Sequence, residues 1–163
     1  MARTTVAAAS RPAPDWQQLT ITVRVYGLGE LGQFPPGTPA PFDLINRHQV
    51  NGVFIVSGDT HWAEFSRVDD AVGYPLWEAT SSGLTEEWKQ ISPNRHRLGR
   101  GEHRNNYGLI EIDWAAEQPF MTVSIKGQDG EIMMQNNVRF RTLGNLSRLP
   151  EQTRTELEEL GGP

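Results

Sequence analysis

Two side chains that could bind a metal ion stand close together in the segment Ser57-Gly58-Asp59-Thr60-His61. Asp59 and His61 are two residues apart, so in an extended segment both side chains emerge on the same side. A carboxylate oxygen and an imidazole nitrogen on one edge form half of a site for a hard or borderline divalent cation. The structural alternative is that Asp59 caps the loop and His61 packs half-buried. The spacing predicts a metal half-site and leaves that alternative open.

The residues before this pair predict how it is positioned. Residues 53–56 (VFIV) are a continuous apolar run, which is typical of a strand buried on both faces. Residues 41–50 start with a proline and have apolar positions that predict a short helix, which Asn51-Gly52 would end. Helix, turn and buried strand indicate an α/β layered fold, in which ligands bind beyond the carboxyl ends of the strands.

Several further segments have the residue patterns of strands. Gly127-Gln128-Asp129-Gly130 has the glycines that a tight hairpin needs between two of them. The alternating residues 19–25 predict an edge strand. The predicted strands are residues 19–25, 63–68, 75–81, 107–114, 120–126 and 131–140.

Three segments are predicted to lie outside the sheets. Residues 94–104 are interpreted as a basic, solvated loop, with a phosphate-steering patch as the alternative. A helix is predicted to start at Thr85, with Glu86 and Glu87 in its first turn. Residues 149–163 predict a carboxy-terminal amphipathic helix whose apolar face would carry Leu149, Thr153, Leu157 and Leu160.

Composition limits the classes of function. The chain has 163 residues, of which 37% are hydrophobic, so one domain with a buried core is expected. Its 15 Lys and Arg against 20 Asp and Glu give a net charge of -5, which argues against a dedicated nucleic-acid binder. No apolar run approaches the roughly 20 residues that span a bilayer. The absence of cysteine excludes disulfides, thiolate metal sites and cysteine nucleophiles.

The amino-terminal part gives little information about function. Residues 1–18 are interpreted as a disordered leader, and the short apolar stretch at residues 6–9 is too brief for a signal peptide. Residues 19–41 are an irregular segment, because beyond the predicted edge strand they are crowded with Gly and Pro.

Three stretches in order over residues 50–114 resemble a known family. VNGVFIVSGDTHWAEFSR, YPLWEATSSGLT and NNYGLIEIDW are similar to the carboxy-terminal part of the alkaline phosphatase D (PhoD-like) metallophosphatases. The resemblance implies the carboxy-terminal half of a calcineurin-like α/β/β/α sandwich, β-rich with short flanking helices, with residues 42–148 as a partial domain. It also implies an exported enzyme that hydrolyses phosphomonoesters or phosphodiesters.

The resemblance also implies a metal centre. The Gly-Asp-x-His string corresponds to the last metal-binding motif of the family, so His61 is the implied ligand and Asp59 a ligand or the partner of one. The implied cofactors are divalent or trivalent ions (Fe, Ca, Zn, Mn or Mg). Two such ions would lower the pKa of a bound water and clamp the phosphate oxygens, with no protein nucleophile.

The chain departs from the family in one important respect. Two ions need on the order of eight to twelve ligands counting waters, and the family's earlier motifs, which supply most of them, are absent. The spacing of Asp69, Asp70, His96 and His103 recommends none of them as substitutes. We interpret part of residues 19–41 as a frame-shifted remnant of family sequence, because codons for these residues can be written so that a shift of one base gives residues typical of the family.

These considerations predict a fragment with an incomplete metal centre. Its expected partners are a phosphoester substrate if the centre is completed, and either the missing amino-terminal half or a second copy paired through an exposed sheet edge. Nucleic acid and membranes are not expected partners. The alternative function is a non-catalytic remnant or interaction module of the same fold.

Overall fold

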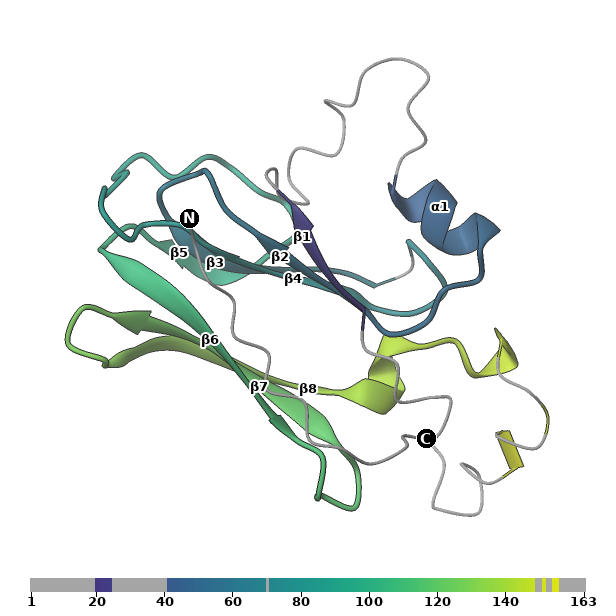
Figure 1. Cartoon of the computed structure of the whole chain (residues 1–163). Coiled ribbons are helices and arrows are strands. Elements are labelled where there is room, and N and C mark those ends of the chain that lie inside the picture. Colours follow the sequence, from purple (N-terminus) through teal and green to yellow (C-terminus); the bar gives the residue numbers. More distant parts are fainter. Residues whose placement is uncertain (1–19, 25–40, 70, 149–150, 152–153, 156–163) are drawn as a thin grey trace.

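The computed structural model of the chain describes residues 20–24, 41–69, 71–148, 151 and 154–155. They form two β-sheets with few helices, an arrangement compatible with the α/β class. In Figure 1 the two sheets form two layers, with α1 at one end of the five-stranded layer. The elements are β1 (Thr20–Arg24), α1 (Pro41–Arg47), β2 (Val53–Ser57), β3 (Ala63–Val68), β4 (Leu76–Ser81), β5 (Arg97–Glu102), β6 (Asn106–Asp113), β7 (Phe120–Gly127), β8 (Ile132–Arg139), η3 (Phe140–Leu143) and η4 (Leu146–Arg148).

The five-stranded sheet has the order β1-β2-β4-β3-β5. Strands β1, β2 and β4 are parallel, whereas β3 pairs antiparallel with both β4 and β5. The carboxyl ends of β2 and β4 therefore lie side by side at the same end of the sheet. The predicted edge strand at residues 19–25 is confirmed as β1 over Thr20–Arg24.

The three-stranded sheet is an antiparallel meander in the order β6-β7-β8. The predicted hairpin at residues 127–130 joins β7 to β8, with the Gly130 amide donating to the Gly127 carbonyl at 3.0 Å. Gly130 has a φ of 81°, which a residue with a side chain rarely adopts.

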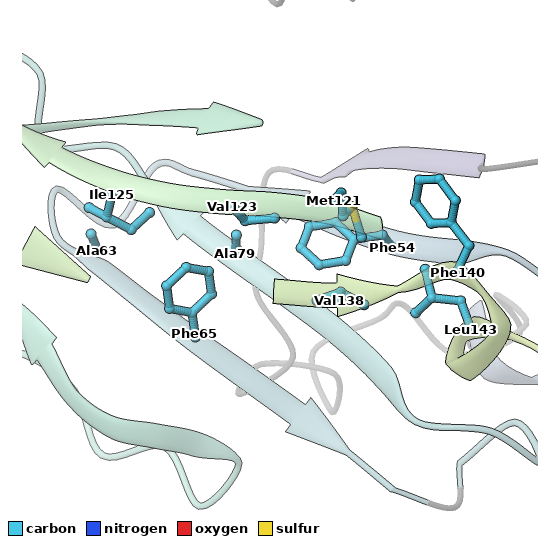
Figure 2. Packing of buried hydrophobic residues seen from close by; sticks show 10 residues of the cluster. All are labelled: Phe54, Ala63, Phe65, Ala79, Met121, Val123, Ile125, Val138, Phe140 and Leu143. Atoms are coloured by element: carbon cyan, nitrogen blue, oxygen red, sulfur yellow. The ribbon is translucent and has the colours of Figure 1, made fainter. Parts of the chain in front are cut away.

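The main core lies between the two sheets, where side chains of both inner faces meet (Figure 2). Phe54 of β2 is fully buried in this core and lies beside Met121 of β7, whereas the buried Ile125 of the same strand lies farther along the core, near Ala63 (Figure 2). The remaining buried members are Ala63, Phe65, Ala79, Val123, Val138, Phe140 and Leu143.

A second cluster covers part of the opposite face of the five-stranded sheet. Ile55 of β2 packs there with Leu76 of β4, with Tyr74, and with Ile45 of α1. Because Phe54 and Ile55 are adjacent and buried in different clusters, β2 is buried on both faces, as its apolar run predicted.

Two predicted elements are wrong. Residues 94–104 were expected to form a loop, but they contain strand β5 over Arg97–Glu102. The prediction failed because charged residues and glycines hide the apolar alternation by which a strand is recognised. No helix starts at Thr85, and residues 82–90 are irregular. This segment is instead held by backbone bonds to its neighbours, including one from the Trp88 amide to the His61 carbonyl.

Some predictions fall partly outside the described residues. The leader at 1–18 and the Gly/Pro-rich stretch at 25–40 lie outside them entirely. Of the carboxy-terminal helix predicted for residues 149–163, Glu151, Arg154 and Thr155 are helical, and the four residues of its apolar face are not described. Among the described residues, no helix is long and apolar enough to cross a membrane.

Candidate functional site

Three loops that are distant in sequence meet at the carboxyl ends of β2 and β4. The His61 amide donates to Ser82 Oγ at 3.0 Å, and that hydroxyl lies 3.3 Å from Thr60 Oγ1. The Asn106 amide donates to the Gly83 carbonyl at 3.0 Å. We name residues 58–62, 82–88 and 104–106 the strand-end site. Each of its three loops contains residues of one of the three stretches that resemble the family.

Gly83 lies where the three loops approach most closely. A Cβ at this position would lie 3.3 Å from the carbonyl oxygens of both His61 and Arg104, and closer still to the side-chain nitrogen Nδ2 of Asn106. A side chain would therefore push the loops apart. The glycine is needed for close packing, and it brings the backbone of His61 near the chain that follows β5.

Asp59 and His61 do not lie in the extended segment on which their predicted common orientation depended. Their φ angles are 73° and 59°, in the left-handed region, within a bend. For a residue with a Cβ this conformation costs about 1–3 kcal/mol, and such strain often accompanies functional sites. Asp59 is exposed and makes neither a hydrogen bond nor an ion pair with any described residue.

The imidazole of His61 is the best positioned metal-binding group of the site. Its side chain is 40% exposed, and its ring stacks on Trp88 with the centroids 6.3 Å apart. Its Nε2 atom lies 3.9 Å from Glu86 Oε2. An imidazole nitrogen and a carboxylate oxygen at this separation could share a cation.

Sequence reasoning missed Glu86 as a member of the site. The sequence placed Glu86 in the first turn of a helix, and the structure places it in an irregular segment that passes beside His61. No sequence spacing connects residues 61 and 86. Their contact depends on two hydrogen bonds of the His61 backbone, whose amide donates to Ser82 Oγ and whose carbonyl accepts from the Trp88 amide.

The site as described does not provide the full set of ligands of a metal centre. Within the part of the chain that the structure describes, no three His, Asp or Glu side chains gather as a metal-binding group. Asp69 is paired with Arg67 at 2.7 Å, and His96 Nε2 accepts from Arg95 at 2.9 Å. Because structural zinc sites use four protein ligands and catalytic ones three, the described residues supply only part of a ligand set.

A row of buried polar side chains lies beneath the strand-end site, on the face of the five-stranded sheet opposite the main core. At the end of the row nearest the strand-end site, the hydroxyls of Ser57 and Thr80 bond each other at 2.7 Å. The row comprises Ser57, Glu64, Ser66, Glu78 and Thr80, all buried.

Glu64 connects the buried row to the strand-end site. Its Oε2 atom accepts from Arg97 Nε at 2.6 Å and from Trp62 Nε1 at 3.2 Å. Its Oε1 atom accepts from Asn94 Nδ2. Because Trp62 belongs to the loop of His61, the Glu64–Arg97 pair fixes the base of that loop.

A second ion pair stands where the chain leaves β5. Arg104 Nη2 donates to Glu102 Oε2 at 2.7 Å, and the Arg104 backbone amide donates to Oε1 at 3.0 Å. The hydrogen bond from the Arg104 side chain, together with that backbone bond, lowers the pKa of Glu102 to about 2. A carboxylate with a lowered pKa stabilises the fold above its unfolded-state pKa and loses that contribution as the pH falls.

The variant Arg104→Gln is expected to reduce stability at neutral pH and to change its acid dependence. The loss relative to the native chain should be constant above about pH 5.5, should shrink as the pH falls through 4.5 toward 2, and should vanish below about pH 2, where Glu102 becomes protonated in both proteins. Urea unfolding at a series of pH values measures this difference. A difference that persists unchanged at pH 2 would contradict the assignment.

Comparison with known proteins leaves the family of the chain open. No protein-family model matches the chain, and no curated protein matches it significantly.

Proposed function

We propose that the chain contributes the strand-end corner of a PhoD-like, metal-dependent phosphoester hydrolase. The observation that carries the proposal is the meeting of three loops around His61 at the carboxyl ends of parallel strands, where ligands bind in α/β sheets. Each of these loops contains part of one of the three stretches that resemble the family, and nothing in the sequence spacing required them to meet.

The finer fold of the proposal is the carboxy-terminal half of a calcineurin-like sandwich. Two features support it. The two sheets pack face to face through one core, and α1 contributes Ile45 to the outer face of the five-stranded sheet. In a complete sandwich the outer face of the three-stranded sheet would also carry helices, which the described residues do not provide.

The proposed role of the chain is to supply and orient metal ligands. His61 would bind a metal ion through its half-exposed imidazole. The ring stacks on Trp88, and the His61 backbone amide is held by its hydrogen bond to Ser82 Oγ. Asp59 and Glu86 are the carboxylates available beside it. Bound metal ions would supply a water of lowered pKa and clamp phosphate oxygens. Because the described residues give too few ligands, we assign no catalytic step to them alone.

Zinc binding tests the proposal directly. His61→Ala is expected to weaken Zn²⁺ binding by at least about tenfold, because it removes the central ligand, and Glu86→Gln should weaken it less. His48→Ala is the matched control, since His48 is exposed at the end of α1, and it should bind as the native chain does. Isothermal titration calorimetry measures the affinities, and turnover of an aryl phosphate measures activity.

Equal Zn²⁺ affinity of the native chain and His61→Ala would contradict the proposal. A native chain that binds no Zn²⁺ would favour the second function, an interaction module. The observation in favour of the second function is that Leu84 and Trp88, both in the strand-end site, are 66% and 51% exposed. Large apolar side chains exposed together often mark a surface that contacts another protein.

A further inference from the structure

The edge of the three-stranded sheet that β8 forms is the least protected sheet edge that the structure describes. Strand β8 runs over eight residues, Ile132–Arg139, and pairs only with β7 within the described ranges. It contains neither proline nor glycine, and its first seven residues carry no charge although the chain has a net charge of -5. A strand of this kind presents a free row of amides and carbonyls that can pair with another strand.

The two other edges with described side chains are protected in ways that β8 is not. Strand β5 carries Arg97, Arg100 and Glu102, and its pairing with β3 is interrupted by a register shift. Strand β6 begins against the end of β4, where Ser81 Oγ donates to Asn106 Oδ1 at 2.9 Å. Charges, irregular register and covering chain are the usual devices that keep edges from pairing.

The amide side chains on the outer face of β8 are oriented by β7. Gln135 donates through Nε2 to Ser124 Oγ at 2.9 Å, so its Oε1 atom can still accept a hydrogen bond. Asn137 accepts through Oδ1 from Thr122 Oγ1 at 2.9 Å, so its Nδ2 group can still donate. The two residues thus offer complementary groups two positions apart on the same face.

We propose that β8 pairs antiparallel with β8 of a second copy of this chain, about a two-fold axis at Asn136. In this register Gln135 lies opposite Asn137 of the second copy, and its Oε1 atom accepts from that residue's Nδ2 group. On the inner face Met134 lies opposite Val138 of the second copy. The two three-stranded sheets become one continuous sheet of six strands.

This register is selected by the side chains and not only by the backbone. In an antiparallel pair, residues directly opposite each other have their side chains on the same face of the sheet. A two-fold axis meets this condition only when it lies between the two copies of one residue. An axis at Asn136 places the amides of Gln135 and Asn137 opposite each other, and the apolar side chains of Met134 and Val138 opposite each other. At each end of the paired segment Met133 lies opposite Arg139. The contact is isologous, so it closes as a dimer and does not extend into a fibre.

Charge-swap variants at Asn136 test the proposal. The native chain should have twice the 18.3 kDa mass of one copy by sedimentation equilibrium. Asn136→Lys and Asn136→Asp each place like charges opposite each other at the axis, so each should weaken the dimer by at least about tenfold. An equimolar mixture of the two variants should restore the dimer, because opposite charges then face each other.

Controls separate loss of pairing from loss of fold. Glu111→Lys changes an exposed residue on β6, at the other edge of the same sheet, and should leave the dimer unchanged. Far-ultraviolet circular dichroism should be the same for both Asn136 variants and the native chain. A monomeric native chain, Asn136 variants that dimerise like the native chain, or a mixture that stays monomeric would each overturn the proposal. The outcome is independent of Zn²⁺ binding at His61.

Discussion

Replacing Arg97 with alanine is expected to destabilise the fold by about 3 kcal/mol or more. Glu64 is 7% exposed at the side chain, and Arg97 is its cationic partner, with Nε 2.6 Å from Glu64 Oε2. Removing one member of a buried pair leaves an uncompensated charge, which costs about 3–5 kcal/mol. Asn94 and Trp62 still donate to the carboxylate, so the lower end of that range is expected.

The matched control is Arg95→Ala, two residues earlier in the same segment. Arg95 is exposed, and among the described residues its side chain bonds only the neighbouring His96, so its loss should change stability by no more than about 0.5 kcal/mol. Urea unfolding measures both variants. In a double-mutant cycle with Glu64→Ala, a coupling of at least about 1 kcal/mol is expected. Equal effects of the two arginine replacements would show that the pair does not support the fold.

Replacing Phe54 with alanine is expected to cost about 3–5 kcal/mol. Phe54 is fully buried between the two sheets, in a cluster to which β3, β4, β7 and β8 also contribute side chains (Figure 2). Removing a buried aromatic ring loses its transfer free energy and leaves a cavity that the close-packed core closes only in part. Because the ring joins both sheets, thermal unfolding should also shift to a markedly lower temperature.

Phe120→Ala serves as the comparison for Phe54. Phe120 begins β7 and is only half-buried, so its replacement should cost about 1–2 kcal/mol. Both variants are measured by urea unfolding under the same conditions. Similar losses at the two positions would contradict the central position of Phe54 in the core.

The strands were the part of the fold that local patterns predicted well. Residues 63–66 alternate between apolar and polar side chains and begin β3, which spans the predicted range 63–68, and residues 53–56 lie within β2. Such patterns succeed because a strand exposes alternate side chains to one face, and burial of that face selects apolar residues there. The glycines at 127 and 130 predicted the hairpin, and Gly130 adopts the left-handed conformation that residues with a side chain rarely take.

The errors occurred where an element depends on its neighbours. Strand β5 has the sequence RLGRGE, which lacks the apolar alternation of a strand, and it forms because the edge of β3 offers it a partner. Conversely, Thr85 with two following glutamates has the local signature of a helix start. The backbone there bonds the His61 loop and the chain after β5, which leaves no helix.

The sequence by itself determined the chemical types at the strand-end site and the strand that carries them. It predicted that Asp59 and His61 follow the buried strand β2, because apolar runs and glycines act locally. Only the tertiary structure decided that the loops of Ser82 and Asn106 meet the His61 loop around Gly83, that Glu86 lies beside His61, and that both predicted ligands occupy left-handed backbone conformations. Those outcomes depend on hydrogen bonds between loops more than 20 residues apart, for which no local pattern in the chain carries a signal.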